Sequence, residues 1–535
     1  MALQFYQPLL EFILRLPVVR GDKMSPVEEK NAARLRELCS QRLSQRRLIF
    51  ASNRGPIEYS LTEDKRLQAR RSGGGMVSVL RGISSFVELD WVASAMGEGD
   101  RQAVQRAQGG RIKVPIAGEK LYLRFVVTPR NAYHKFYSVI CNPLLWFLQH
   151  HMWNLSYTPN IGRTVYDAWE NGYVPVNQAF AQAVIDEVVE NESPPIILLN
   201  DYHLYLAGAY IRSRFPNLVI QHFTHIPWPE PCYWQLLPDF MRHSILRSLC
   251  ASDIVGLQTK RDVHSFLHCC QTLIDGADVD HEQQTVRIDE HVVQVKAYPI
   301  SIDVAGLKKL ASSPKLQEYE EKLRPLYGEQ TIVRVDRAEP SKNILRGFKA
   351  FDTLLERYPQ FLGKVKFIAF LVPTRTHIGQ YQRYTQEVMQ LIDEINSKYG
   401  TENWHPIDYF YENNYLQAIG GMRSYDVLLV NGVIDGMSLV AKEGPTVNTR
   451  DGVVILSETI GACEQLGKDA LKVAPADLEG TTQALYAALT MPIEEKKRHA
   501  AGLRKAIEEE DITNWLFHLL EDAANMVQQR SGTAT

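Results

Sequence analysis

Residues 427–444 read VLLVNGVIDGMSLVAKEG. The apolar run 427–430 predicts a buried strand, and the loop 431–436 that follows it is polar and contains glycine. The residues after this loop predict a helix. A strand, a short loop and a helix in this order form the repeating unit of a parallel sheet covered by helices.

Short apolar runs of the same kind recur along the chain with helix-like segments between them. The predicted strands are 48–51, 196–199, 218–220, 332–333, 367–372, 427–430 and 453–456. Most of them end at a polar stretch or one that contains Gly or Pro. In open α/β sheets ligands bind beyond the carboxyl ends of the strands, so these loops are the predicted location of the chemistry.

The length of the chain predicts more than one domain, because 535 residues exceed the ~250–300 at which a single hydrophobic core stops growing. A break is expected between residues 301 and 330, where strand-like sequence gives way to a charged helical stretch. Near the end, Trp515, Leu516, Leu519 and Leu520 predict a helix with an apolar stripe that packs on the body. The expected parts are an extension, 1–47; two α/β domains, 48–304 and 305–510; and a last helix with a frayed tail, 511–535.

Residues 1–20 are apolar but interrupted by polar side chains, and they lack the features of a signal peptide. Phe5, Leu9, Phe12 and Leu16 fall at helical spacing and predict an amphipathic helix. We expect this helix to dock on the body or on a partner subunit; a membrane surface is the alternative.

Composition excludes several classes of protein. The 59 basic and 62 acidic residues give a net charge of -3, which argues against a general nucleic-acid binder. The seven cysteines are odd in number and contain no C-x-x-C pair, so neither a disulfide framework nor a zinc ribbon is indicated. No run approaches the ~18 apolar residues of a membrane span. We therefore expect a cytoplasmic protein without membrane association.

Two loops of the first half suit an anionic ligand. One is 52–56, and the other contains Gly73, Gly74 and Gly75 before a helix-like stretch. Consecutive glycines let backbone N–H groups approach an anion closely, and a helix amino terminus adds positive potential. A flexible connection between strand and helix is the alternative interpretation.

A carboxylate and an imidazole follow successive apolar segments of the first half. Asp201 lies in Asn-Asp-Tyr-His, and His225 begins His-Ile-Pro-Trp-Pro. Both side chains can point into one crevice and hold sugar hydroxyls, with the prolines and an aromatic ring forming a rigid wall. The alternative is a turn residue and a hydrogen-bonded structural histidine.

Two cations follow a predicted strand of the second half. Arg337 and Lys342 lie five residues apart, and fixed positive charge there suits a diphosphate leaving group. A solvated basic turn is the alternative. Further on, Asp435 precedes a helix whose first N–H groups suit a phosphate, and Glu443 lies about two turns later, so both can flank one ligand.

Together these segments resemble the trehalose-phosphate synthase family of glycosyltransferases. The leading match is Asp-Gly-Met-x-Leu-Val-Ala-Lys-Glu at 435–443 with Ile-Leu-Ser-Glu-x-x-Gly-Ala at 455–462. The other matches, in chain order, are Ser-Asn-Arg at 52–54 with a downstream Gly-Gly, Asp-Tyr-His-Leu at 201–204, His-Ile-Pro-x-Pro at 225–229, Arg-x-x-x-x-Lys at 337–342 and Pro-Thr-Arg at 373–375. The resemblance extends from about Leu48 to Leu520.

The resemblance implies an α/β fold of two facing Rossmann-like domains, the GT-B architecture, with the active site in the cleft between them. The acceptor would bind mainly to residues 48–304 and the nucleotide sugar to residues 305–510, with the last helix returning to the first domain. Such enzymes retain anomeric configuration without a protein nucleophile, because the leaving phosphate accepts the proton of the acceptor. The resemblance implies no metal and no resident cofactor.

Site residues carry over by motif position. The resemblance assigns the acceptor phosphate to Arg54, Tyr137, Trp146 and Arg375. It assigns the donor to Gly74, Gly75, Arg337, Lys342, Ser438, Leu439, Val440 and Glu443. It places Asp201, His225, Arg337, Lys342 and Asp435 at the reacting centre.

The chain departs from the family pattern at several positions. The family usually has Arg-x-Asp-Tyr-Ser-Lys-Gly where this chain has Glu339, Pro340 and Asn343, Arg where it has Ile434, and Asn where it has Ser438. The first departure resembles the validoxylamine-phosphate-synthase-like pseudo-glycosyltransferases, which join cyclitols through nitrogen.

The sequence is therefore compatible with three functions. The first is transfer of glucose from a UDP-, GDP- or ADP-linked sugar to a sugar phosphate, giving trehalose 6-phosphate. The others are the pseudo-glycosyltransferase reaction and a catalytically silent sugar-phosphate-binding regulator. A homo-oligomer is left open.

Overall fold

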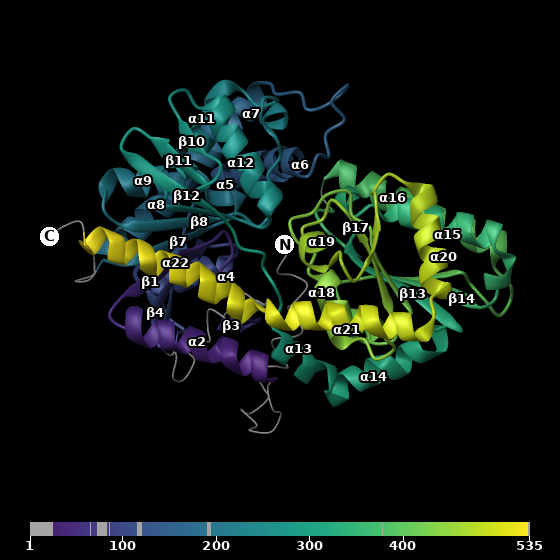
Figure 1. Ribbon diagram of the computed structural model, residues 1–535. Helices are drawn as coiled ribbons and strands as arrows, with labels where there is room; N and C mark the ends of the chain where they lie inside the picture. The colour runs from purple at the N-terminus through teal and green to yellow at the C-terminus, as the bar shows by residue number, and fades with distance from the viewer. Residues whose placement is uncertain are drawn as a thin grey trace. The chain divides into compact units, whose positions relative to one another are not determined.

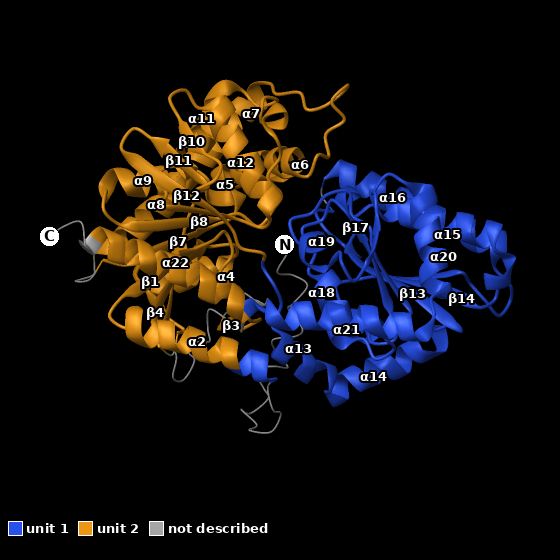
Figure 2. Ribbon diagram, viewed as in Figure 1, with its two compact units in different colours: residues 1–29, 73–75, 300–512 blue, residues 30–72, 76–299, 513–535 orange. Residues whose placement is uncertain are grey.

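The computed structural model describes residues 25–64, 66–71, 83–84, 86–114, 120–189, 194–376 and 378–532 (Figure 1). The chain divides into two compact units (Figure 2). Unit 1 comprises residues 1–29, 73–75 and 300–512, and unit 2 comprises residues 30–72, 76–299 and 513–535. Each unit is built around its own sheet.

Unit 2 contains a ten-stranded sheet in the order β10-β11-β12-β9-β8-β7-β1-β4-β6-β5. Its strands are β1 (Arg47–Ala51), β4 (Glu88–Ser94), β5 (Ile112–Lys113), β6 (Leu121–Val126), β7 (Ile196–Asn200), β8 (Val219–Phe223), β9 (Ile254–Leu257), β10 (Asp278–Asp280), β11 (Thr285–Ile288) and β12 (His291–Ala297). In this spatial order, all neighbouring strands between β12 and β6 are parallel. The strands β10 and β11 at one edge and β5 at the other edge pair with their neighbours in the antiparallel direction. A separate hairpin pairs β2 (Ile57–Leu61) with β3 (Leu67–Arg71).

Unit 1 contains a six-stranded, wholly parallel sheet in the order β15-β14-β13-β16-β17-β18. Its strands are β13 (Gln330–Arg337), β14 (Val365–Val372), β15 (Ile407–Tyr411), β16 (Val427–Val430), β17 (Val453–Ser457) and β18 (Leu471–Val473). Counted along the chain, this order is 3-2-1-4-5-6, the Rossmann order. The parallel strands of unit 2 follow the same order with β12 added, so the prediction of two Rossmann-like α/β domains is confirmed.

Helices cover both sheets. Those of unit 1 are α13 (Val304–Ala311), α14 (Pro314–Leu323), α15 (Ile344–Arg357), α16 (Gly379–Tyr399), α17 (Tyr415–Met422), α18 (Val440–Val447), α19 (Ala462–Leu466), α20 (Leu478–Thr490) and α21 (Ile493–Glu509). Those of unit 2 include α4 (Glu98–Arg106), α5 (Arg130–His134), η2 (Lys135–Leu145), α6 (Trp146–Gln149), α7 (Arg163–Ala168), η3 (Trp169–Tyr173), α8 (Val174–Val189), α9 (Ala207–Arg214), α10 (Pro231–Trp234), α11 (Asp239–Leu249) and α12 (Lys260–Leu273). In unit 1, Phe348 and Phe351 of α15 meet Phe367 of β14 edge to face in the core.

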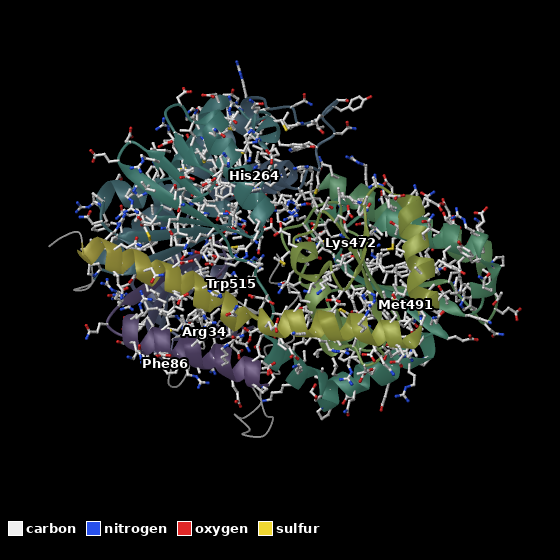
Figure 3. All side chains as sticks on the ribbon, viewed as in Figure 1. Arg34, Phe86, His264, Lys472, Met491 and Trp515 are labelled. Atoms are coloured by element: carbon white, nitrogen blue, oxygen red, sulfur yellow. The ribbon has the colours of Figure 1, made fainter. Side chains whose placement is uncertain are left out.

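The last helix, α22 (Ile512–Gly532), belongs to unit 2 from residue 513 onward. Trp515 donates from its indole to the Tyr298 carbonyl at 3.2 Å, and the predicted stripe of Trp515, Leu516, Leu519 and Leu520 is buried as expected. On α2 (Pro26–Arg42), the Arg34 guanidinium lies 4.0 Å from the centre of the Phe517 ring. Figure 3 labels Arg34 and Trp515, which mark this pair of helices. The helix predicted for residues 1–20 lies outside the described residues.

Each predicted strand corresponds to an observed one. Most ends agree within two residues, but β8 continues three residues beyond the predicted 218–220 and β13 four residues beyond the predicted 332–333. The strand-like sequence before the expected break at residue 301 corresponds to β12, which stops at Ala297. Sequence periodicity missed β4 and β6, because charged residues interrupt them. Asp90 of β4 is buried and pairs with Arg47 and Arg111, and Arg124 of β6 pairs with the buried Glu187. Pairing lets these charges enter a sheet that an apolar pattern alone would exclude.

Candidate functional site

The strand order of unit 1 reverses between β13 and β16, and predicted site residues follow both strands. β13 ends at Arg337, and a tight turn at Pro340–Lys342 leads into α15. β16 ends at Val430, and its loop leads to α18. In open α/β sheets, this reversal at the carboxyl ends of the strands is where ligands bind.

A carboxylate holds two of the predicted arginines. Glu339 is fully buried, and its Oε1 lies 2.8 Å from Nη2 of Arg337 while its Oε2 lies 3.1 Å from Nη1 of Arg375. The two arginines come together because β13 and β14 are parallel neighbours in which Arg337 pairs with Val372. Arg375 also donates to the Tyr381 hydroxyl at 2.6 Å. Both guanidinium groups are thus fixed before any ligand binds.

The other predicted pair of unit 1 is also in contact. Nζ of Lys342 donates to Oδ2 of Asp435, and both side chains are largely buried. The second oxygen of Asp435 accepts the Gly436 N–H at 3.0 Å. A lysine and a carboxylate separated by 93 residues in the sequence therefore meet at the strand-order reversal.

Helix α18 begins directly after these residues. Ser438 has a φ of 62°, in the left-handed region, and this turn starts the helix that Leu439 and Val440 open. The first N–H groups of a helix have no partner within it and favour an anion. Glu443, one turn further, is buried and accepts from the Tyr415 hydroxyl at 3.1 Å.

Lys442, the residue before Glu443 on α18, is fully buried. Its Nζ donates to the Ile300 carbonyl at 2.8 Å. Burial lowers its pKa from 10.5 to about 7, and the charge of Glu510 opposes this shift only in part. This lysine therefore points into the body of unit 1, where it contacts the first residue of the segment 300–512.

In unit 2 the strand order reverses between β1 and β7, and site residues again follow both strands. Arg54 comes three residues after the end of β1. Its loop is fixed by the Ser52 hydroxyl, which donates to the Arg54 carbonyl at 2.6 Å. The Arg54 guanidinium is 3.4 Å from the half-exposed Glu58 carboxylate, a contact that an incoming anion can replace.

Asp201 and His225 follow β7 and β8 and meet in one group. Asp201 has a φ of 73° and accepts the His225 N–H at 3.2 Å. Burial raises the pKa of Asp201 to about 6, although the N–H groups of Tyr202 and His225 act against this. Burial also lowers the pKa of His225 to about 4, so its imidazole is neutral at physiological pH. Nε2 of His225 lies 3.2 Å from Oδ1 of Asn200.

Aromatic rings connect Tyr137 and Trp146 to the same group. Tyr137 stacks on His203, with ring centroids 6.0 Å apart, and Nδ1 of His203 is 3.7 Å from Oδ2 of Asp201. Trp146 lies 5.8 Å from the Tyr202 ring. The segments η2 and α6 thus bring both residues beside the loop that contains Asp201.

The predicted residues therefore form two sets, one in each unit. Unit 1 brings together Arg337 and Arg375, Lys342 and Asp435, and places Ser438, Leu439, Val440 and Glu443 on one helical segment. Unit 2 brings together Tyr137, Trp146, Asp201 and His225, and Arg54 follows its β1. Gly74 and Gly75 lie outside the described residues. Because Arg54 and Arg375 belong to different units, their shared grip on one phosphate stays a prediction.

Sequence reasoning missed three side chains that support the site. In the sequence, Glu339 stands out only as a departure from the family pattern. Tyr381 and Tyr415, which hold Arg375 and Glu443, gave no signal at all. The roles of the two tyrosines depend on contacts that a linear sequence does not show. For Glu339, the one available signal is an acidic side chain between the basic residues Arg337 and Lys342.

Two kinds of feature are absent from the described part of the chain. No three His, Cys, Asp or Glu side chains there form a group that could hold a metal ion. No helix there is both long and apolar enough to cross a membrane.

Known proteins with similar sequences include synthases and one transferase of another kind. A probable UDP-forming alpha,alpha-trehalose-phosphate synthase of Arabidopsis thaliana is 29% identical over 468 residues, which cover 86% of this chain and 54% of that protein. The enzyme of Schizosaccharomyces pombe named UDP-forming alpha,alpha-trehalose-phosphate synthase is 29% identical, covering 87% and 88%. Validamine 7-phosphate valienyltransferase of Streptomyces hygroscopicus is 27% identical, covering 91% and 96%. The chain spans only 54% and 61% of the Arabidopsis and Dictyostelium discoideum proteins it matches.

Solved structures of proteins with the same kind of name have a similar fold. A trehalose-6-phosphate structure from E. coli with bound UDP-2-fluoro glucose superimposes with a TM-score of 0.76 at 27% identity, covering 89% of this chain and 99% of that one. The family model of Glycosyltransferase family 20 matches residues 46–525, which include every described site residue. With both sheets in Rossmann order and this match over most of its length, the chain belongs to glycosyltransferase family 20.

Proposed function

We propose that the protein is a retaining glycosyltransferase that moves glucose from a nucleotide sugar to a sugar phosphate, with trehalose 6-phosphate as the product. One observation carries this proposal. At the strand-order reversal of unit 1, paired cations, the amino terminus of α18 and the buried Glu443 lie on adjoining loops. This is the set of groups that a nucleoside diphosphate sugar requires, namely positive charge for the diphosphate and an acceptor for the ribose hydroxyls.

In this proposal Arg337 and Lys342 stabilise the negative charge that develops on the leaving diphosphate. The N–H groups of Leu439 and Val440 assist at the helix terminus. Glu443 accepts hydrogen bonds from the ribose, as its contact with the Tyr415 hydroxyl already shows it can do for a hydroxyl group. Asp435 contacts the transferred sugar and holds Lys342 in place.

The acceptor side is assigned to unit 2. The neutral imidazole of His225 and the carboxylate of Asp201 suit sugar hydroxyls, because each accepts a hydrogen bond without bringing a positive charge. Tyr137, Trp146 and Arg54 are assigned to the acceptor phosphate, together with Arg375 of unit 1. The leaving phosphate takes the acceptor's proton on the face from which it departs, which retains the anomeric configuration.

The test is to incubate the full chain with glucose 6-phosphate and, separately, with UDP-, GDP- and ADP-glucose. We expect nucleoside diphosphate to be released from one donor, dependent on the acceptor, and an α,α-linked disaccharide phosphate to be identified by its anomeric NMR couplings. Binding of both substrates without release would support the silent regulator instead. Release that does not depend on the acceptor would contradict transferase activity.

A second function is favoured by the departures around the donor cations. Glu339, Pro340 and Asn343 replace the usual family residues, and validamine 7-phosphate valienyltransferase is as similar to this chain as several of the synthases. The protein would then join a nucleotide-activated cyclitol to an aminocyclitol phosphate through nitrogen. Validamine 7-phosphate with a nucleotide-activated valienol is therefore the second substrate pair to assay. A higher kcat/KM for that pair would decide for this alternative.

A further inference from the structure

Three side chains of unit 1 form a buried trio with one acid between two bases. Glu339 has no exposed surface, and less than a tenth of Arg337 and of Arg375 is exposed. The carboxylate uses a different oxygen for each guanidinium, at 2.8 Å for Arg337 and 3.1 Å for Arg375. The Ser341 hydroxyl donates a further hydrogen bond to Oε1 at 3.1 Å.

Backbone hydrogen bonds fix the position of this carboxylate. The Ala338 N–H donates to the Val372 carbonyl at 2.9 Å, which extends the contact between β13 and β14 beyond the strand end. The Glu339 N–H donates to the Arg337 carbonyl at 2.8 Å, so the chain turns tightly at this residue. The backbone of Glu339 is therefore fixed next to the carboxyl end of β13.

The proposed function assigns the two arginines to different substrates. Arg337 is assigned to the diphosphate of the donor and Arg375 to the phosphate of the acceptor. Two guanidinium groups with one carboxylate leave a net positive charge at the trio. Guanidinium groups bind phosphate in defined planar geometries, so their orientation matters as well as their charge.

We infer that Glu339 is a positioning residue that orients the donor cation and the acceptor cation at once, so that both phosphate groups depend on one buried carboxylate. This inference rests on the proposed function for the identity of the two ligands. It predicts that a change at Glu339 weakens both ligands together, whereas a change at either arginine acts mainly on one.

The opposing view treats Glu339 only as a counter-ion. Removing its negative charge would then raise the positive potential at the site and tighten the binding of both phosphates. Positioning predicts the opposite sign, because glutamine keeps one acceptor oxygen and places an NH2 group, a donor, against the other guanidinium. The direction of the change in affinity therefore separates the two roles.

The experiment measures binding of UDP and of glucose 6-phosphate to the full chain by calorimetry. We expect Glu339→Gln to weaken both ligands by about tenfold, a loss of about 1.4 kcal/mol each, and Glu339→Asp, which keeps both oxygens, to recover most of it. The matched control is Glu320→Gln, which removes the carboxylate 2.7 Å from Arg423 on other helices of unit 1. Tighter or unchanged binding in Glu339→Gln, or a change for one ligand alone, would overturn the inference.

A second readout needs no ligand. Phenylglyoxal modifies accessible guanidinium groups, and peptide mass spectrometry reports its rate at each arginine. We expect Glu339→Gln to raise the rates at both Arg337 and Arg375 several-fold, and Glu320→Gln to raise neither. Equal rates in Glu339→Gln and the unchanged protein would refute positioning. Failure of glucose 6-phosphate and of all three nucleoside diphosphates, UDP, GDP and ADP, to bind the unchanged protein would refute the proposed function alone.

Removing a buried carboxylate between two cations can also prevent folding. If Glu339→Gln does not fold, Ser341→Ala carries the test, because it removes one hydrogen bond to the carboxylate and leaves its charge in place. We then expect UDP and glucose 6-phosphate to weaken together by about twofold to threefold. A change confined to one of them would count against the shared anchor.

Discussion

Each cation at the strand ends of unit 1 has a carboxylate partner. Arg337 is paired with Glu339 and Lys342 with Asp435, and all four side chains are largely buried. An unpaired charge in such surroundings costs several kcal/mol, so the carboxylate partners offset the cost of placing these cations at the site before substrate arrives. A phosphate then meets groups that are already oriented, which is the condition for strong stabilisation of a transition state.

The first prediction concerns these two cations. We expect Arg337→Ala or Lys342→Ala to lower kcat by about 10²–10³, the loss seen when one donor to a developing negative charge is removed. Steady-state rates with the productive nucleotide sugar measure this, and circular dichroism checks that the fold is intact. A folded variant with near-normal turnover would show that neither cation stabilises the leaving group.

The second prediction concerns the acceptor phosphate. We expect Arg54→Ala or Arg375→Ala to raise the KM for the sugar phosphate by roughly 10-fold or more, since a charge-assisted contact is worth about 1.5–3 kcal/mol. The KM for the nucleotide sugar should change much less. Unphosphorylated glucose serves as the comparison, and it should be a poor acceptor for the unchanged protein. If glucose works as well as glucose 6-phosphate, the phosphate site does not exist.

Among the elements, α18 has a first turn that is assigned to a ligand and, in the same turn, a lysine that is buried in unit 1. Its first turn offers N–H groups to a ligand, while Lys442 in the same turn is buried and reaches the Ile300 carbonyl at 2.8 Å. The hydrogen bond ties the helix to the start of the segment 300–512. It also holds the amino group in a buried position, and this burial lowers the pKa of Lys442 to about 7.

The third prediction follows from this burial. The pKa of Lys442 is about 7 in the folded protein and has its ordinary value of 10.5 in the unfolded chain, so the unfolded chain binds the proton more tightly. The penalty on folding grows as pH falls from 10.5 to 7 and is constant below 7. We therefore expect Lys442→Met to raise the free energy of unfolding at pH 7 by on the order of 2 kcal/mol, after the lost hydrogen bond is subtracted.

Urea unfolding at several pH values measures this effect. The gain from Lys442→Met should shrink toward pH 10, where the unchanged protein no longer carries the penalty. Lys472→Met, at the exposed middle residue of β18 in the same unit, is the control and should show no such dependence. A gain that is equal at pH 7 and pH 10 would mean that the pKa of Lys442 is not lowered in the folded state.

At the scale of the whole molecule, both sheets have Rossmann order and both carry polar site residues at their strand-order reversals. The chain leaves unit 2 after residue 299, completes unit 1 by residue 512 and returns to unit 2 through α22. Ile512 donates its N–H to the Ile302 carbonyl at 3.0 Å, so the two ends of the unit 1 segment are hydrogen-bonded to each other. The segment 300–512 is thereby closed on itself within unit 1.

The fourth prediction concerns the reaction of the whole protein. The positive charge assigned to the leaving diphosphate comes from Arg337, Lys342 and a helix terminus, so a divalent cation has no assigned task. We expect turnover to persist at full rate in excess EDTA, measured as release of nucleoside diphosphate. Loss of activity that added Mg²⁺ restores would contradict this assignment.

The sequence alone determined the fold class and predicted most of the candidate site residues. Short apolar runs are buried strands wherever helices cover both faces of a sheet, so 427–430 and 367–372 could be recognised without neighbours. Arg337, Lys342 and Asp435 could be recognised because they belong to local motifs next to such strands. Apolar runs and short motifs involve residues that are close in the sequence, so they can be recognised from the sequence alone.

The tertiary structure decided the pairings. β4 is a strand because Arg47 and Arg111 neutralise Asp90, and Glu339 supports the site because Arg375, distant in the sequence, returns to it from the neighbouring strand. The low pKa of Lys442 likewise depends on what surrounds it after folding. Coulomb interaction and desolvation depend on distance and burial in space, and neither quantity can be read from the order of residues in a chain.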